Sequence, residues 1–277
     1  MSIFREDLEQ LSEIDPYYKL TRDEVARSEF REKIEFIWKE LIDKSLIGDK
    51  EEKIANEAQK NFTGVLWQLE LTYILSKKHK LVKPNDSGPD IIIDNFENGQ
   101  IIIECVASNV SGKNKIERTF GQPVYIDNNK NKLRVLESIF KKLENYKRWL
   151  KNQTISQNDK FIIAIDTSNL PDGDLIGYPN TNIIEMLLYG IGDLFYEVNL
   201  QNGKSAIKYK SKECIEKPNG GIVPSKLTEN QDFKFVTALL WKQESFIRNH
   251  SLSGENIMQF NNNNAINLIK NDFKLLQ

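Results

Sequence analysis

The sequence predicts a single mixed α/β domain in which helices flank a central sheet and a helical extension precedes that sheet. Three observations lead to this fold class. Helical patterns dominate the first 60 residues, a β-hairpin signal follows near residue 100, and a helix and another apolar strand come after the hairpin. Helices and strands that alternate in this way are typical of a sheet covered by helices.

The composition is that of an ordinary globular protein. Of the 277 residues, 39% are hydrophobic and 28% are charged, and the formal net charge is −2. This length fits one large domain, and no segment reads as a linker, so we treat residues 1–277 as one domain. The acidic balance argues against a protein that coats nucleic acid without specificity, but it leaves room for a local basic groove.

Localisation and metal chemistry are also constrained. No apolar run approaches the length of a membrane span, and the first ten residues, MSIFREDLEQ, lack the apolar core of a signal peptide. We therefore expect a cytoplasmic protein with no membrane partner. The chain has two histidines and two cysteines. That is a poor supply of zinc ligands, so any bound metal should be held by oxygen atoms.

The N-terminal region, residues 1–60, is predicted to be helical. Residues 21–46 combine a capping box of Thr21 and Glu24 with apolar residues at helical spacing, and a second helix is expected at about 50–60. Nothing in this region distinguishes a recognition element from a dimerisation element, so a homodimer remains an open alternative.

The middle of the chain, residues 62–166, carries the predicted core. A helix at 63–78 leads into two strands, DIIID and IIIECVA, and the pair Asn98-Gly99 between them suits a hairpin turn. A helix at 129–152 and the apolar strand FIIAID, 161–166, follow. The expected hairpin, helix and strand form the centre of the sheet.

The rest of the fold is expected from residues 167–277. Weaker strands and a helix at about 181–189 come first, and a late strand is predicted at 233–241. We find no defensible chemistry in this part of the sequence.

Two carboxylates border the apolar hairpin strands. Asp90 precedes the first isoleucine run and Glu104 follows the second, so a hairpin can bring them together. Neighbouring carboxylates repel and are costly to bury, and a divalent cation such as Mg²⁺ removes both penalties. In the alternative interpretation Asp90 belongs to a turn and Glu104 faces solvent. The buried character of both isoleucine runs favours the metal site.

Pro89-Asp90, a hairpin-length spacer and Glu104-Cys105-Val106 together resemble the PD-(D/E)xK phosphodiesterase superfamily, the restriction-endonuclease-like nucleases. The resemblance covers about residues 62–166. It implies a restriction-endonuclease-like sheet and a metal-dependent nuclease, with DNA favoured over RNA as the substrate. It also implies Mg²⁺, or Mn²⁺ in its place, bound by Asp90, Glu104 and the Cys105 carbonyl.

Many members of the superfamily carry a further acidic residue on the helix before the hairpin. The segment WQLE, residues 67–70, places Glu70 on that helix. The resemblance therefore implies a supporting or metal-bridging role for Glu70. The other interpretation is an ordinary solvated helix carboxylate.

The sequence departs from the superfamily at Val106, where a lysine usually stands. On the predicted helix at 129–152, Lys142 lies at the edge of the apolar stripe, one turn before Tyr146, while Lys141 points to solvent. This pattern resembles branches in which the lysine has migrated to that helix. It implies a catalytic Lys142 and a Tyr146 that positions Lys142 or a phosphate. The simpler interpretation is a lysine stem beside a core tyrosine.

A basic segment follows the hairpin. Lys113, Lys115 and Arg118 lie in a polar stretch and Arg134 opens the next helix, so we expect these side chains to contact phosphates unless they form a solvated surface. Two other readings stay open. Because of Val106, the chain could be an inactive nuclease-fold module that binds nucleic acid or a protein partner. It could also be an unrelated α/β protein with structural hairpin carboxylates.

Overall fold

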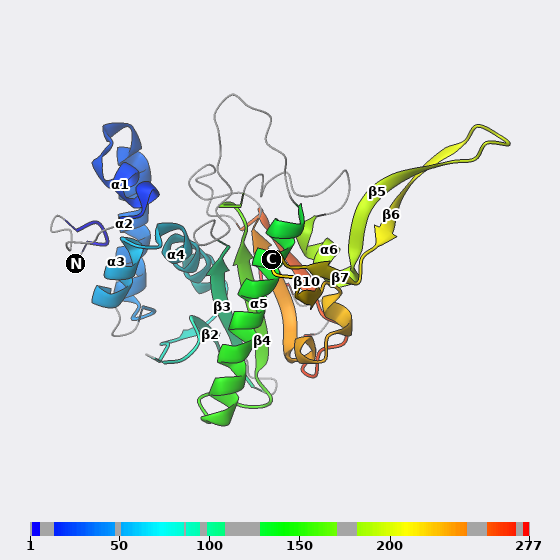
Figure 1. Cartoon of the computed structure of the whole chain (residues 1–277). Helices are drawn as coiled ribbons and strands as arrows, with labels where there is room; N and C mark the ends of the chain where they lie inside the picture. Colours follow the sequence, from blue (N-terminus) through cyan, green and yellow to red (C-terminus); the bar gives the residue numbers. More distant parts are fainter. Residues whose placement is uncertain are drawn as a thin grey trace.

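The fold is known from a computed structural model, which describes residues 2–5, 14–47, 51–85, 87–94, 99–108, 128–170, 182–242, 254–269 and 274–276. A mixed six-stranded sheet lies at the centre, with helices on both faces (Figure 1). This confirms the expected mixed central sheet flanked by helices. In spatial order the strands are β1 (Leu81–Val82), β2 (Ile91–Ile93), β3 (Ile101–Ala107), β4 (Lys160–Asp166), β9 (Val236–Lys242) and β10 (Ile257–Asn261).

The predicted hairpin forms one side of this sheet. Strands β1, β2 and β3 are antiparallel, and Ile92 of β2 lies opposite Ile102 of β3. Strand β3 then runs parallel to β4, and β4 runs parallel to β9. β10, which we did not predict, pairs antiparallel with β9 at the far edge. Of the expected turn pair, Asn98 lies outside the described residues and Gly99 adopts a φ of 124°, which suits glycine.

Two long helices cover the faces of the sheet. Helix α4, Phe62–Ser76, packs on the face that carries Ile103 and Ala164, and helix α5, Asn128–Lys151, packs on the face that carries Ile102 and Ile163. The alternation of side chains along β3 therefore sends successive residues to opposite helices. Glu104 lies on the α5 face, and Cys105 lies on the α4 face.

The N-terminal region is helical, as predicted. The prediction that one helix begins at residue 21 and runs to residue 46 is wrong, because α1 already begins at Pro16 and a separate helix, α2, begins at Ser28. Asp15 caps helix α1, Pro16–Asp23, by accepting hydrogen bonds from the amides of Tyr17 and Tyr18. Thr21 is thus inside α1, and Glu24 ends it. The rest of the region comprises a 3-10 helix, Val25–Arg27, and the helices α2, Ser28–Asp43, and α3, Glu51–Ala58. These helices form a second hydrophobic core against the N-terminal half of α4.

The C-terminal part adds small elements to one end of the sheet. Helix α6 begins with a capping box of Asn182 and Glu185 and ends at Gly190. A long two-stranded ribbon then projects away from the body (Figure 1). The elements of this part are α6 (Ile183–Tyr189), β5 (Ile191–Val198), β6 (Ser205–Ser211), β7 (Cys214–Glu216), β8 (Ile222–Pro224) and two 3-10 helices (Leu227–Glu229 and Asp232–Phe235). Among the described residues, no helix combines the length and the apolar character needed to cross a membrane.

Candidate metal and phosphate site

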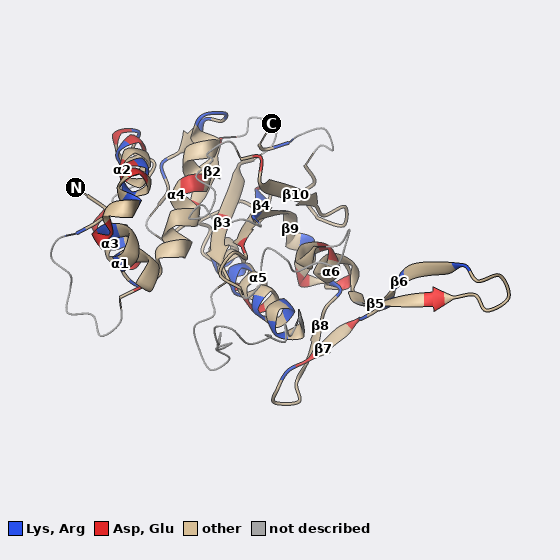
Figure 2. Cartoon of the chain, turned by 90° about the horizontal axis from the view of Figure 1, so that it is seen from above, with Lys and Arg blue, Asp and Glu red and all other residues tan. Residues whose placement is uncertain are grey.

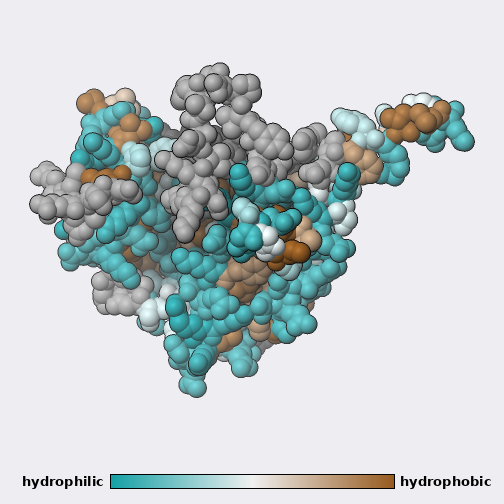
Figure 3. Space-filling view, viewed as in Figure 1, coloured by the Kyte–Doolittle hydropathy of each residue, from teal (hydrophilic) through white to brown (hydrophobic). Residues whose placement is uncertain are grey.

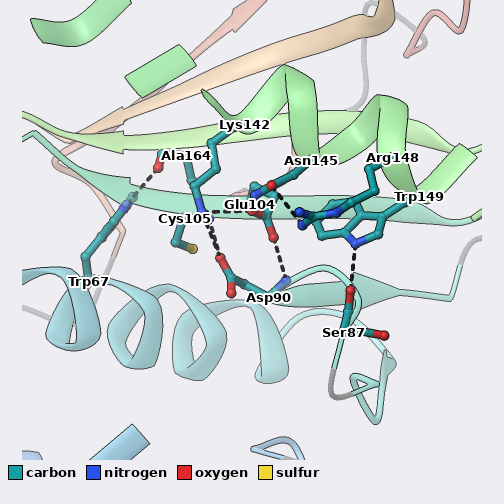
Figure 4. A network of polar contacts seen from close by, with 10 residues as sticks. All are labelled: Trp67, Ser87, Asp90, Glu104, Cys105, Lys142, Asn145, Arg148, Trp149 and Ala164. Atoms are coloured by element: carbon teal, nitrogen blue, oxygen red, sulfur yellow. Dashed lines mark hydrogen bonds and ion pairs between the residues drawn. The ribbon is translucent and has the colours of Figure 1, made fainter. Parts of the chain in front are cut away.

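The candidate site lies where the two hairpin strands stop pairing. The ladder between β2 and β3 ends at Ile91 and Ile103, so Asp90 and Glu104 are the next two residues in register. Their chains are joined by two hydrogen bonds (Figure 4). The Asp90 amide donates to Glu104 Oε1 at 3.2 Å, and the Cys105 amide donates to Asp90 Oδ2 at 2.9 Å. The sequence prediction that these two carboxylates converge is confirmed.

Lys142 reaches both carboxylates from helix α5. Its Nζ lies 2.8 Å from Glu104 Oε2 and 3.7 Å from Asp90 Oδ2. Its side chain is 16% exposed. The expectation that this lysine turns toward the hairpin carboxylates is therefore confirmed, while Lys141 is exposed as predicted. Figure 4 shows the amine between the two acidic side chains.

Asn145 is a site residue that the sequence analysis missed. Its Nδ2 donates to Glu104 Oε2 at 3.4 Å, and its Oδ1 accepts from Arg148 at 3.0 Å. Asn145 follows Lys142 by three residues, so the two lie on one face of α5. The three-residue spacing from Lys142 predicts that Asn145 lies beside it, whereas the resemblance implied a role for Tyr146.

Helix α5 also holds the segment that leads into Asp90. The Trp149 indole nitrogen donates to the Ser87 carbonyl at 2.6 Å (Figure 4). Trp149 lies two helical turns after Lys142 on the same face. One helix therefore supplies the amine and fixes the backbone three residues before Asp90.

Burial dominates the electrostatics of Glu104, whose residue is 3% exposed. Burial and the neighbouring Asp90 charge raise the Glu104 pKa to about 7, although Lys142 acts in the opposite direction. Burial by itself lowers the Lys142 pKa, but the charges of Asp90 and Glu104 outweigh it and raise that pKa above its usual value. With this arrangement Lys142 is a charged donor at neutral pH.

A polar cavity of about 490 Å³ opens beside these residues. Its floor is the end of β3, where β2 no longer covers the strand, and helices α4 and α5 form opposite walls. Arg134 lies on the α5 wall, so this predicted phosphate-binding residue lines the same cavity as Asp90. The residues that line the cavity include Gly64, Gln68, Asp90, Cys105, Ser108, Arg134, Ser138, Lys141, Lys142 and Asn145.

Glu70 does not join this site. It is 3% exposed and forms an ion pair with Lys242 of β9, two strands away from β3. The reason is the orientation of α4, because the Trp67 indole donates to the Ala164 carbonyl at 3.0 Å and turns that side of the helix onto the sheet. Burial raises the Glu70 pKa to about 7. Gln68, rather than Glu70, is the α4 residue that lines the cavity.

Tyr146 does not join the site either. Its ring stacks on Phe161 with a centroid separation of 4.6 Å, and the residue is 2% exposed. Lys142 lies between Asn145 and Tyr146 around the helix, with Asn145 toward Glu104 and Tyr146 toward the core. The expected contact of Tyr146 with Lys142 or a phosphate is replaced by core packing. The predicted phosphate contacts Lys113, Lys115 and Arg118 lie outside the described residues.

The donor set suits a magnesium-type ion. Within the described ranges, no three His, Cys, Asp or Glu side chains gather into a metal-binding group. Asp90 and Glu104 supply two carboxylates, and the Cys105 carbonyl points to the same side of β3 as the amide that bonds to Asp90. Mg²⁺ typically takes one or two carboxylates and completes its shell with water and phosphate oxygens. The Cys105 thiol is buried, which raises its pKa well above the usual value.

No family model matches the chain, and no curated protein or solved structure gives a significant match to it.

Proposed function

We propose that this protein is a metal-dependent phosphodiesterase that hydrolyses nucleic acid, with DNA as the substrate. The observation that carries the proposal is the position of Lys142, whose amine lies 2.8 Å from one hairpin carboxylate and 3.7 Å from the other. Two facing carboxylates and an amine at the edge of a polar cavity supply the groups that metal-assisted phosphodiester hydrolysis needs. The motif around Pro89-Asp90 and Glu104-Cys105-Val106 favours DNA.

Asp90, Glu104 and the Cys105 carbonyl would hold the metal. A bound Mg²⁺ would supply Lewis-acid polarisation of the phosphate and lower the pKa of a bound water. Glu104 must be ionised to serve as a ligand, and its pKa of about 7 makes that state accessible at neutral pH. The two hydrogen bonds between the hairpin strands hold both carboxylates in place before any ligand binds.

Lys142 would act on the water and the phosphate. Its amine is paired with Asp90 and Glu104, and their charges keep it protonated. With a cation held by Asp90 and Glu104, the pull of their charges on the Lys142 proton would be weaker. The amine would then donate a hydrogen bond to the attacking water or to a phosphate oxygen. Arg134, on the wall of the cavity, would hold the phosphodiester backbone.

Nuclease assays with matched variants test the metal ligands. With Mg²⁺ present, Asp90→Asn should lower cleavage of mixed-sequence DNA by about 100-fold or more, as for the loss of an electrostatic group in other enzymes. Asp94→Asn is the control, because Asp94 lies at the other end of β2 and pairs with exposed Lys80. EDTA should abolish cleavage by the wild type. Wild-type cleavage by Asp90→Asn would reject the site.

A second pair of variants tests the amine. Lys142→Ala should lower turnover by about 100-fold, in the range expected for a group that assists proton transfer. Lys141→Ala, on the same helix but exposed, should change turnover by no more than a few-fold. Equal losses in the two variants would remove the role given to Lys142. Parallel assays on duplex DNA, single-stranded DNA and RNA decide the substrate.

One observation favours a second candidate function, a binding module without catalysis. The Lys142 ammonium pairs with both carboxylates and offsets part of their charge, as a bound cation would. Such an arrangement also suits a nuclease fold that binds nucleic acid, or a protein, and no longer cleaves. Calorimetric titration with Mn²⁺ separates the two, because the module predicts no Mn²⁺ binding together with tight binding of nucleic acid or protein.

A further inference from the structure

The β5–β6 ribbon is the most exposed element of the described chain. β5 spans eight residues, which at about 3.3 Å per residue gives a reach of about 26 Å. Every residue from 196 to 208 is exposed to solvent. Figures 1 and 2 show the ribbon extending away from the sheet and its helices in two perpendicular views. Isolated two-stranded ribbons are marginally stable in water, so this one is suited to work against a partner.

One face of the ribbon is apolar. Tyr196 and Ile207 lie opposite each other across the two strands, and Val198 lies on the same face. These side chains are 67%, 54% and 54% exposed, and Leu200 near the tip is 93% exposed. Figure 3 shows hydrophobic atoms gathered at the outer part of the ribbon. Exposed apolar groups on a projecting element mark an interaction surface.

The charge of the ribbon points to a polyanionic partner. Residues 191–212 contain four lysines and two acidic residues, a formal charge of +2, whereas the whole chain carries −2 and the remainder therefore −4. Lys208 pairs with Glu197 at 2.5 Å, while Lys204 and Lys210 are exposed. The remainder of a second copy would offer this arm only −4 spread over 255 residues, whereas duplex DNA carries about one negative charge per 1.7 Å of its length. A phosphate backbone would gain directly.

The tip of the ribbon carries amide side chains, a type of group that can hydrogen-bond to base edges. Asn199, Gln201 and Asn202 are all exposed in the turn between the strands. The Oδ1 atoms of Asn199 and Asn202 accept amide hydrogen bonds within the turn, which fixes their orientation. Asparagine and glutamine pair with the N6 and N7 edge of adenine in the major groove, and apolar side chains contact the thymine methyl group. Amides at the tip and apolar residues beside it therefore suit A·T base pairs.

The base of the ribbon is attached to the helix that carries Lys142. The Lys132 amine donates to the Ile191 carbonyl at 3.0 Å, and the Lys212 amine donates to Asn129 Oδ1 at 2.8 Å. Ten residues of α5 separate Lys132 from Lys142, or about 15 Å along the helix. The base of the ribbon is thus attached to the same helix as the candidate reaction centre.

We propose that the β5–β6 ribbon enters the major groove of duplex DNA, beside the bond presented to the candidate site, and favours A·T pairs there. The groove is about 12 Å wide and admits a two-stranded β-ribbon. Lys204 and Lys210 contact phosphates at the groove edges, the tip amides contact bases, and the apolar face contacts thymine methyl groups. The link to cleavage rests on the proposed nuclease function, but DNA binding by the ribbon does not.

The test measures binding in EDTA, so that it does not depend on cleavage. Fluorescence anisotropy is recorded with a 30-base-pair A·T-rich duplex, a G·C-rich duplex and one single strand. The double variant Gln201→Ala with Asn202→Ala should weaken binding to the A·T-rich duplex by about tenfold. The difference in affinity between the A·T-rich and the G·C-rich duplex should become smaller. Lys204→Ala with Lys210→Ala should weaken binding to both duplexes and reduce the salt slope by about 2. Lys217→Ala, at the tip of the β7–β8 ribbon, is the matched control.

Three outcomes overturn the proposal: unchanged affinity and salt slope in both double variants, equal effects of the control, or equal losses on duplex and single strand. Sedimentation addresses the alternative partner, a second copy of this chain. If Tyr196→Ser with Ile207→Ser abolishes self-association and leaves DNA binding intact, the apolar face is a dimer surface and the proposal fails. Because binding is measured in EDTA and cleavage in the separate Mg²⁺ assays, failure of the nuclease proposal is recognised separately.

Discussion

The ion pair between Glu70 and Lys242 predicts a specific pH dependence of stability. Glu70 is buried between helix α4 and the sheet, and its pKa is raised from 4.5 to about 7 mainly by that burial. Between these two pH values the folded chain keeps a proton that the unfolded chain has lost. The free energy of unfolding therefore falls as the pH rises through this window. The contribution is fully lost above pH 7.

The magnitude follows from the size of the shift. One pKa unit corresponds to about 1.4 kcal/mol, so the rise of the Glu70 pKa from 4.5 to about 7 makes this residue responsible for a loss of about 3 kcal/mol between pH 4.5 and pH 8. Glu70→Gln cannot ionise and still offers an oxygen to Lys242. We expect this variant to lose about 3 kcal/mol less than the wild type across the same window.

Urea unfolding at several pH values, in EDTA and without nucleic acid, measures this difference. Glu57→Gln, which removes an exposed carboxylate from the neighbouring helix α3, is the control and should follow the wild type. If Glu70→Gln and the wild type lose stability in parallel from pH 4.5 to pH 8, burial does not hold the proton on Glu70. The burial argument used for Glu104 would then be weakened as well.

Three further predictions concern single contacts. Tyr146→Phe should leave cleavage and Mn²⁺ binding unchanged, because the ring stacks on Phe161, whereas Tyr146→Ala should destabilise the fold by about 3–5 kcal/mol in urea unfolding. Asn145→Ala should weaken Mn²⁺ binding in calorimetry, because Asn145 donates to Glu104. Arg148→Ala should have a smaller effect on Mn²⁺ binding, because Arg148 contacts Asn145 and not Glu104, and equal effects would contradict this. Trp67→Phe should cost about 1–3 kcal/mol in thermal unfolding, because it removes the buried hydrogen bond from the indole to the Ala164 carbonyl; no loss would contradict the anchoring role.

The carboxylates and the lysine could be placed from the sequence because each follows from a regular period. Strand alternation and hairpin pairing put Asp90 opposite Glu104, and the angle per residue in an α-helix put Lys142 at the edge of the apolar stripe of α5. Both periods are local properties of the backbone. The structure confirms all three placements.

The predictions for Glu70 and for the start of the N-terminal helix were wrong because contacts beyond the local pattern decide both. Helix α4 is buried on nearly all sides, so its periodicity did not show that Gln68 faces the cavity and Glu70 faces Lys242 of a distant strand. The capping box at Thr21 was a sound local signal, but Asp15 before Pro16 is a better cap and starts the helix earlier. Local patterns do not include such long-range or competing contacts.

The hydrogen bond from the Trp149 indole to the Ser87 carbonyl gives Asp90 a second attachment. Asp90 is joined to β3 through Glu104 and Cys105, and the backbone just before it is joined to α5, the helix that supplies the Lys142 amine. The distance between the ammonium and the aspartate is therefore determined by two independent elements of the fold. Trp149→Phe would remove one of these attachments and leave the other in place.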